Sequence, residues 1–350
     1  MKKPKLFINT FDPQTASDDV WEKFFEAYKK YQEEMYPGDP LPSNDRLKKE
    51  MKNPGPDPKD FRWLVFSEET NMNVIGYGRV TIYNESSPAY QSNKHVASGM
   101  LFIDKEYRRL GIGTELLMIL VTKVKREQKT VFQGGSQHES GKEFCQKFGA
   151  KIALTEEENR LNLEDVDWDM INEWKIEGPK RAEGVTIEMF ETVPEKDIEE
   201  YCKIYAETLN QVPKGELEWE AVETPKTRRI REKRRKLLGA TWTTMITREE
   251  NGVISGLTET IYNPDRETLL FQALTGVKKE YRGRGLGKWL KAEMVTYIKK
   301  TFPEVKYLVT DFSITNAPMI AINKRLGFKK HMMWTEYKFN VEDLCQRLGL

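Results

Sequence analysis

The stretch Glu280–Met294 reads EYRGRGLGKWLKAEM, and the stretch Glu106–Leu120 reads EYRRLGIGTELLMIL. In each, an arginine leads into two glycines spaced G-x-G, and a run with the apolar spacing of a helix follows. Glycine has no Cβ, so backbone N–H groups can approach a ligand closely. The first helical turn adds free N–H donors and the positive end of the helix dipole. Both stretches therefore predict a strand–loop–helix site for phosphate or pyrophosphate.

The similarity extends beyond the two loops. KEYR at Lys105–Arg108 recurs at Lys279–Arg282, with an offset of 174 residues. TIYN recurs upstream at Thr81–Asn84 and Thr260–Asn263, with an offset of 179, and CQKFGA at Cys145–Ala150 parallels NKRLGF with an offset of 178. Because the three blocks keep their order while the offsets drift by a few residues, they indicate a duplicated domain with loop insertions.

A length of 350 residues suits two domains of ordinary size. We place an N-terminal domain at 1–175 and a C-terminal domain at 185–350, with the junction in a charged segment around Gly178-Pro179. Both are predicted to be mixed α/β. The expected helices are Asp18–Tyr36, Leu110–Gln128, Glu195–Asn210, Leu286–Thr301 and Ala317–Leu326; the expected strands are Arg62–Ser67, Val74–Tyr83, His95–Ile103, Val185–Phe190, Ala240–Arg248, Gly252–Tyr262, Glu267–Val277 and Lys306–Phe312.

Composition narrows the function classes. Lys and Arg number 56 against 55 Asp and Glu, a balance that argues against a general nucleic-acid partner. No stretch has the ~20 apolar residues of a membrane helix, so we expect no membrane association. Three cysteines and three histidines lack disulfide or metal-ligand spacing, so we expect reduced thiols, a cytoplasmic location and no metal. The basic segment Thr224–Lys236 is either a solvated helix flank or a patch that attracts an anionic substrate or cofactor phosphates.

Two familiar glycine motifs do not fit. A P-loop requires Lys-Ser/Thr after its last glycine, whereas Gly287 is followed by Lys288-Trp289, and neither copy has the third glycine of a dinucleotide fingerprint. The shared pattern R-x-x-G-x-G resembles the acyl-CoA pyrophosphate loop of the GNAT superfamily of N-acetyltransferases. The whole chain resembles tandem GNAT proteins of the mycothiol-synthase-like type. This resemblance implies an α/β fold of two tandem GNAT domains, each with a mixed, mostly antiparallel central sheet flanked by helices.

The resemblance also implies the positions that bind acetyl-CoA, the expected cosubstrate. Backbone amides of the loop would hold the pyrophosphate, and the end of the preceding strand would pair with the pantetheine arm. The implied CoA-binding residues are Val277, Arg282, Gly283, Arg284, Gly285, Leu286, Gly287, Lys288 and Asn316 in the second half, and Ile103, Arg108, Arg109, Gly111, Ile112 and Gly113 in the first.

In the family, the thiolate leaving group often receives a proton from a tyrosine four residues before the glycine of the last helix. This position is Asn323 in the second half and Cys145 in the first. Asn323 can still donate a hydrogen bond to sulfur or to CoA, although it is not an acid, whereas a cysteine is only a weak donor. Asn323 is therefore a candidate catalytic residue.

An ammonium with a pKa near ~10.4 must lose a proton before it attacks a thioester, so a base is expected. The position of the family's usual carboxylate holds Phe271. Glu259, on the preceding strand, lies opposite Leu270 or Phe271 according to the length of the turn, and these two registers place it on different faces. Glu259 is therefore either the missing base or a solvent-facing residue of a half-buried strand.

These features predict a GNAT-type acyl-CoA N-acyltransferase of the EC 2.3.1 class, which moves an acetyl group to a primary amine of a small molecule by direct attack. The second half is expected to hold the working site, and the first half is expected to be degenerate. A monomer or a homodimer is expected. Two alternatives stay open: an aminoglycoside- or peptide-directed acetyltransferase, and a non-catalytic acyl-CoA-binding sensor.

Overall fold

The computed structural model describes residues 4–68 and 72–350, and the chain divides into two compact units. Unit 1 comprises the residues up to Thr155 together with Lys214–Trp219 and Trp334–Leu350. Unit 2 comprises Glu156–Pro213 and Glu220–Met333. This division differs from the contiguous domains 1–175 and 185–350 that the repeat suggests.

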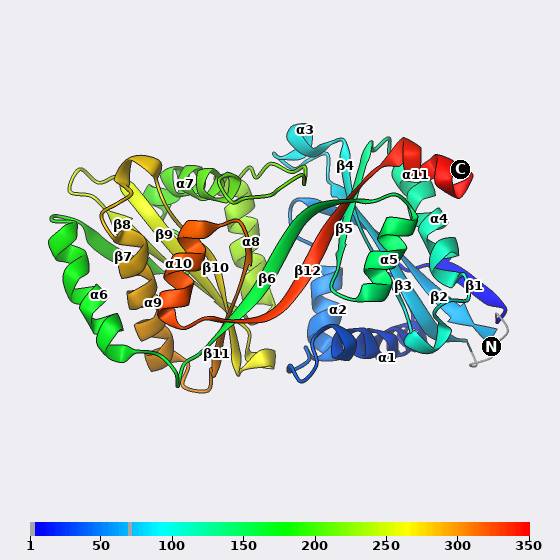
Figure 1. The fold of residues 1–350 in the computed structure, drawn as a ribbon, viewed down its shortest axis with the longest axis horizontal. Coiled ribbons are helices and arrows are strands. Elements are labelled where there is room, and N and C mark those ends of the chain that lie inside the picture. The colour runs from blue at the N-terminus through cyan, green and yellow to red at the C-terminus, as the bar shows by residue number, and fades with distance from the viewer. Residues whose placement is uncertain (1–3, 69–71) are drawn as a thin grey trace. The chain divides into compact units, whose positions relative to one another are not determined.

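Unit 1 contains a sheet with the strand order β1-β2-β3-β4-β5-β12 (Figure 1). Neighbouring strands are antiparallel except for the parallel pair β4 and β5. The strands are β1 (Leu6–Thr10), β2 (Pro58–Ser67), β3 (Asn73–Tyr83), β4 (Val96–Ile103), β5 (Val131–Ser136) and β12 (Lys329–Asn340); the helices are α1 (Asp18–Met35), α2 (Asn44–Lys52), α3 (Tyr90–Asn93), α4 (Ile112–Arg126), α5 (Glu139–Lys147) and α11 (Val341–Leu348).

Unit 2 repeats this plan with the strand order β6-β11-β10-β9-β8-β7, and its parallel pair is β10 and β11. The strands are β6 (Lys151–Asn162), β7 (Thr186–Phe190), β8 (Thr241–Arg248), β9 (Ile254–Tyr262), β10 (Leu269–Val277) and β11 (Tyr307–Ser313); the helices are α6 (Trp168–Arg181), α7 (Ile198–Asn210), α8 (Pro225–Leu237), α9 (Leu286–Thr301) and α10 (Ala317–Leu326). The predicted mixed, mostly antiparallel sheets are confirmed in both units.

The last strand and helix of each sheet come from the opposite half of the sequence. In unit 1, residues Thr335–Asn340 of β12 pair with β5, and the following α11 packs on α4. In unit 2, residues Glu156–Asn162 of β6 pair with β11, and the following α6 packs on α9. A repeat pattern cannot reveal such an exchange, because an exchanged strand and a retained strand have the same side-chain alternation.

Each sheet is covered by helices on both faces. In unit 1, α4 and α11 bury one core and α1 and α2 bury another, with Leu116 and Phe24 fully enclosed. In unit 2, α9, α10 and α6 bury the core around Leu290, and α7 buries the core around Leu257. Each sheet therefore buries apolar residues on both of its faces. No helix among the described residues is both long and apolar enough to cross a membrane.

The two parallel strand pairs part before the strands end. In unit 1, the pairing of β4 with β5 runs only from Val96↔Val131 to Ser98↔Gln133, while β4 continues to Ile103. In unit 2, the pairing of β10 with β11 runs from Leu269↔Tyr307 to Phe271↔Val309, while β10 continues to Val277. Each splay opens toward the glycine loop that follows its strand, so a ligand can reach both together.

Both registers considered for Glu259 are wrong. Leu270 pairs with Tyr262 and Phe271 pairs with Ile261, because a short 3-10 helix at Pro264–Arg266 makes the turn longer than expected. Beyond Phe271, β10 carries a bulge between Gln272 and Thr275, and Glu259 lies opposite it.

The basic segment Thr224–Lys236 forms most of α8 and begins with a capping box and Pro225 in the first turn. It is not uniformly solvated, because the side chain of Arg228 is fully buried. The interpretation as a solvated flank is therefore wrong at this position. Arg228 contributes to a polar network in unit 2 that is described below.

Candidate functional site

Both predicted loops end in a left-handed glycine at the start of a helix. Gly111 is the N-cap of α4 and Gly285 the N-cap of α9, each with φ +83°. This conformation is costly for a residue with a Cβ. No side chain of the described residues caps either helix, so no side chain occupies the first-turn N–H groups. Such a helix start is suited to bind an anion.

The first arginine of each loop closes the loop onto its own strand. Arg108 Nε donates to the carbonyl of Ile103 at 2.9 Å, and Arg282 Nε donates to the carbonyl of Val277 at 3.1 Å. The remaining Nη2 group of Arg282 donates to the side chain of Gln211. The shared arginine therefore fixes the shape of the loop, which explains why it recurs in both copies.

The two loops differ at the next position. Arg109 has φ +63° and Gly283, its counterpart, has φ +85°. A non-glycine residue in this region stores ~1–3 kcal/mol of strain, whereas glycine adopts it freely. Arg109 also forms an ion pair with Glu143 of α5. The loop of unit 2 is thus the more relaxed of the two.

Cations gather at the start of α9. Lys288 was predicted to bind CoA, and it lies near Arg181 and Arg325: burial lowers the pKa of Lys288, and the charges of Arg325 and Arg181 lower it further. A Cβ on Gly285 would lie 3.6 Å from Arg181 Cδ. Repelling cations beside a helix start favour a phosphate between them. No local motif marks Arg181, because it ends α6 and is far from the glycine loop in the sequence.

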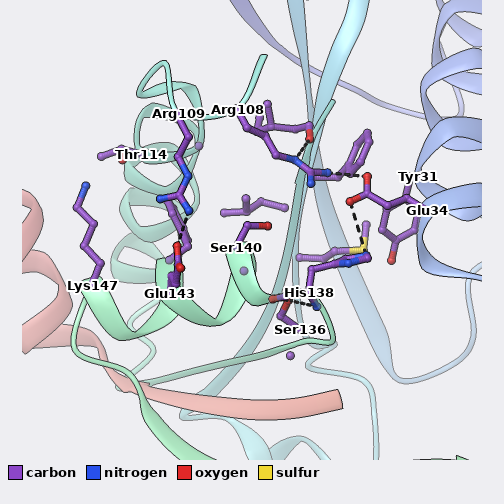
Figure 2. A pocket seen from close by; sticks show the side chains of 18 of the residues that line it. Tyr31, Glu34, Arg108, Arg109, Thr114, Ser136, His138, Ser140, Glu143 and Lys147 are labelled. Carbon is purple, nitrogen blue, oxygen red and sulfur yellow. Dashed lines mark hydrogen bonds and ion pairs between the residues drawn. The ribbon is translucent and has the colours of Figure 1, made fainter. Parts of the chain in front are cut away.

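A cavity of about 350 Å³ lies in the splay of unit 1 (Figure 2). Its wall is formed by the end of β4, the glycine loop, the start of α5 and the end of α1. The loop residues Arg108, Arg109, Gly111 and Gly113 line it together with Ile103, as the sequence predicts. The cavity therefore joins the anion-binding helix start to the place where the strands part.

A carboxylate and a histidine face each other in this cavity. Glu34 Oε2 accepts from Arg108 Nη2 at 2.6 Å, and Glu34 Oε1 lies 3.6 Å from His138 Nε2 (Figure 2). The backbone N–H of His138 donates to Ser136 Oγ at 3.2 Å. Neither Glu34 nor His138 was singled out from the sequence, because α1 and the start of α5 meet only in the folded unit.

The thiol of Cys145, which takes the position of the family's tyrosine in unit 1, is inert. Burial, with a smaller contribution from the charge of Glu336, raises the pKa of Cys145 to about 12. A thiol with this pKa stays protonated at neutral pH and is a weak hydrogen-bond donor. Cys145 therefore replaces the tyrosine without its acidity.

The bulge in β10 distinguishes the splay of unit 2. Ala273 and Leu274 have no partner in the register of β9, whereas β3 and β4 pair without interruption in unit 1. Gln272 Nε2 donates to the carbonyl of Glu259 at 2.9 Å and to Thr258 Oγ1 at 3.1 Å, so its side chain fills the gap in the ladder. A bulge releases backbone N–H groups from the ladder, and such groups can stabilise a developing oxyanion.

Glu259 is enclosed rather than open to the splay. Its exposed fraction is 1%, and Arg228 Nη1, the Tyr201 hydroxyl and Thr244 Oγ1 all donate to Oε1. Burial raises the pKa of Tyr201, and the charge of Glu259 raises it further. Burial opposes the charge of Arg228, but Tyr201 and Glu259 outweigh it and raise its pKa. Glu259 Oε1 is thus occupied by three donors inside a buried network, so it is not available to an acceptor amine while the network is intact.

Asp311 of β11 is an open carboxylate beside the splay. Since Phe271 pairs with Val309, Asp311 lies two residues further along β11, level with the bulge of β10. Loss of surrounding water and the charges of Glu158 and Glu156 together raise the pKa of Asp311 to about 7 against the opposing charge of Arg160, although the side chain itself stays exposed. A carboxylate with this pKa can accept a proton near neutral pH.

The two predicted asparagines occupy the ends of one helix. Asn316 is the half-buried N-cap of α10, and its side chain does not cap that helix. Asn323 is buried toward the other end, where Oδ1 accepts from Lys291 Nζ of α9 at 3.0 Å. The structure thus places Asn323 against α9, the helix that follows the glycine loop, and its role toward CoA stays a prediction.

This fold and this site define a known class of enzyme. The model of the acetyltransferase (GNAT) family matches the chain twice, at residues 19–150 and 207–328, so the chain belongs to the GNAT acetyltransferase family. Its two copies coincide with the two loop–helix sites described above. No curated protein sequence matches the chain.

Solved structures match almost the whole chain. A tandem GNAT protein from the clavulanic acid biosynthesis pathway has a TM-score of 0.76 at 18% identity, over 96% of this chain and 99% of that chain. A GCN5-related N-acetyltransferase from Sphaerobacter thermophilus has a TM-score of 0.64 at 15% identity, over 96% of each chain. At this identity the likeness shows the fold, which is that of two tandem GNAT domains.

The described ranges, 4–68 and 72–350, contain no group of three or more His, Cys, Asp or Glu side chains that could hold a metal ion.

Proposed function

We propose that the protein transfers an acetyl group from acetyl-CoA to a primary amine of a small molecule, and that unit 2 carries out the reaction. The observation that carries this proposal is the splay of β10 and β11. It combines a left-handed glycine helix start, a bulge with two unpaired residues and an open carboxylate with a raised pKa. Membership of the GNAT family supports acyl transfer in general.

The CoA pyrophosphate binds in this proposal to the amides that start α9. Gly285 and Gly287 allow the close approach, and Arg181, Lys288 and Arg325 provide positive charge. The pantetheine arm pairs with the end of β10 near Val277, which has left β11 by this point. Unit 1 offers the same cradle with its cavity, and we assign it a binding role without turnover.

The residues of unit 2 divide the chemistry among them. Asp311 takes a proton from the acceptor ammonium as its nitrogen forms the new C–N bond. The N–H groups released by the bulge stabilise the oxyanion of the thioester carbon. Asn323 then donates a hydrogen bond to the sulfur as the C–S bond breaks. The buried network of Glu259 and Arg228 holds α8 against the sheet behind this site.

The acceptor follows from the charge near the splay. Asp311 pairs in register with Glu158, and Glu156 lies two residues along the same strand and face. Arg160 pairs with Glu158, but the three carboxylates outnumber this one guanidinium, so the face attracts an ammonium group and repels an acid. A cationic small molecule is therefore the preferred acceptor, and a polycationic aminoglycoside or a peptide amine shares this chemistry. The cavity of unit 1 favours the alternative of an acyl-CoA sensor, because unit 1 has a place for a ligand but has no bulge in β4.

Release of free thiol from acetyl-CoA across a panel of primary amines tests the proposal. We expect turnover with cationic amines, and we expect kcat/KM to rise with pH through about 7 as Asp311 ionises. CoA binding measured by calorimetry is the control. Binding without turnover for every amine would contradict the enzyme proposal and would support the sensor.

A further inference from the structure

A lysine is buried inside unit 2, and no acidic side chain of the described residues pairs with it. Lys291 lies on α9 with an exposed fraction of 1%, and its Nζ donates to Asn323 Oδ1 at 3.0 Å. The Phe328 ring centroid lies 5.7 Å from Nζ. Lysine is almost never fully buried unless it is paired with a charge. A buried ammonium held by one neutral amide therefore requires a specific explanation.

The orientation of Asn323 follows from this contact. Lys291 Nζ donates to the amide oxygen of Asn323, so this oxygen faces the lysine. The Nδ2 group of Asn323 is left over, and it is buried with no hydrogen-bond partner among the described residues. A buried donor without an acceptor destabilises the fold. The Nδ2 group is thus arranged for an acceptor that arrives with a ligand.

Lys291 and Asn323 lie about as far from the mouth of the splay as the bulge of β10 does. A Cβ on Gly287 would meet Val277 and Ile322 within 4 Å, so this side of α9 faces the mouth of the splay and α10. Lys291 follows one turn later on the same side, about 6 Å deeper along the helix. Thr275 lies two residues back from Val277, a distance of about 6.6 Å along β10, at the edge of the bulge.

We infer that Asn323 Nδ2 donates to the CoA sulfur as the thiolate leaves, and that Lys291 is a positioning residue that places positive charge behind this amide. The inference rests on the proposed function of unit 2. When the C–S bond breaks, its electron pair passes to the sulfur, and the proton of the acceptor amine passes to Asp311. The sulfur leaves as an anion, so an ammonium on the opposite side of the donating amide stabilises it.

The burial of Lys291 makes this effect specific to the reacting state. Burial lowers the pKa of Lys291 to about 7. The groups that contact it from α10 and the segment after it, Asn323 and Phe328, carry no charge. At neutral pH the ammonium is only partly formed before reaction, and a nearby thiolate raises its pKa. Lys291 is therefore most fully protonated when the sulfur becomes negative. An interaction that is stronger in the transition state than before the reaction accelerates the reaction.

The pKa of the bound CoA thiol tests the inference without turnover. The pKa is measured from the ultraviolet absorbance of the thiolate, with bound desulfo-CoA as the reference. The protein carries Gly111→Asp, which puts a carboxylate into the cradle of unit 1, so that CoA binds in unit 2 alone. We expect Lys291→Met to raise this pKa by about one unit, because an opposite charge is lost. Lys300→Met, an exposed position on the same helix, should not change it. An unchanged thiol pKa in Lys291→Met would overturn the inference.

Turnover provides a second readout. Lys291→Met should lower kcat about 10-fold, the equivalent of one pKa unit, while KM for acetyl-CoA stays within about twofold. Asn323→Leu, which removes the donor instead of the charge, should raise the thiol pKa in the same direction. If the wild type acetylates no amine, the proposed function fails, whereas the thiol pKa still decides the inference. A loss of kcat in both variants with an unchanged thiol pKa would reduce the pair to a structural role.

Discussion

Unit 1 and unit 2 share the glycine-loop cradle that we propose for CoA, and they differ beside it. Both have the left-handed glycine, the arginine that closes the loop onto its strand and the parted parallel strands. When the two strand pairs and the two helices are matched residue by residue, Asp311 corresponds to Gly135, Lys291 to Leu117, and Asn323 to Cys145. The uninterrupted β4 of unit 1 also lacks the bulge of β10.

This difference indicates that the groups proposed to bind CoA are present in both units, whereas the side chains proposed to react are present in unit 2 and replaced in unit 1. The cradle uses backbone groups and glycine conformations, and both copies retain these. The proposed reaction uses side chains at three positions, and in unit 1 each has become glycine, an apolar residue or a weak donor. A fold supports a reaction only through its site, so the comparison predicts that equivalent substitutions in the two units have unequal effects.

The largest effect is expected at the open carboxylate. Asp311→Asn should lower kcat by about 10²- to 10⁴-fold, the contribution of a general base, and should abolish the rise in activity through pH 7. Glu157→Gln, which neutralises a carboxylate on the opposite face of β6, is the control. The pH–rate profiles of both variants check the prediction, and a rise retained in Asp311→Asn would exclude this base.

The same substitution has a stability effect with a defined sign. The folded state raises the pKa of Asp311 from 3.8 to about 7, so it binds more protons than the unfolded chain between these pH values. Stability is therefore lost as pH rises through this window. Asp311→Asn should raise the thermal midpoint at pH 8 and leave it nearly unchanged at pH 4. An equal shift at both pH values would show that the carboxylate titrates normally.

Breaking the buried network of Glu259 and Arg228 should lower the free energy of unfolding and leave the pH dependence of the reaction unchanged. Glu259→Gln leaves the Arg228 guanidinium buried with a weaker partner set, which costs up to about 3–5 kcal/mol. Denaturant unfolding measures this loss, and Glu195→Gln, at an exposed partner of Arg229, serves as the matched control. The pH–rate profile of folded Glu259→Gln should keep its shape. Loss of its rise through pH 7 would restore Glu259 as the base.

The smallest effect is expected at the cations around the cradle. Arg181→Gln should raise KM for acetyl-CoA about 3- to 10-fold, equivalent to about 1 kcal/mol of a partly exposed ionic contact, with little change in kcat. Because salt screens such contacts, the difference should shrink at high ionic strength. Lys180→Gln, the neighbour that pairs with Glu177, should leave KM unchanged. An effect as large in Lys180→Gln would remove Arg181 from the cradle.

The features that depend on local sequence pattern could be predicted from the sequence. The loops, the α9 helix and most strands follow from glycine spacing and periodicity, and the two mixed sheets are confirmed. The exchange of β6 and β12 does not follow from pattern, because it concerns which sheet a strand joins. The register of Glu259 was missed because a 3-10 turn and a bulge each shift the pairing. Asp311 and Lys291 gain their properties from neighbours distant in sequence, so no local signal marks them.

A matched pair of loop variants tests the central claim most directly. Gly111→Asp and Gly285→Asp each place a carboxylate at the start of a CoA-binding helix, and aspartate tolerates the left-handed conformation better than most residues. Gly→Asn at the same positions controls for backbone strain. The measurement is kcat/KM for acetyl-CoA with the best amine of the panel. We predict that Gly285→Asp lowers kcat/KM about 100-fold or more, which corresponds to the loss of about two charge-assisted hydrogen bonds to the pyrophosphate. Gly111→Asp should lower kcat/KM less than about threefold. The reverse order would place the reaction in unit 1 and contradict the account.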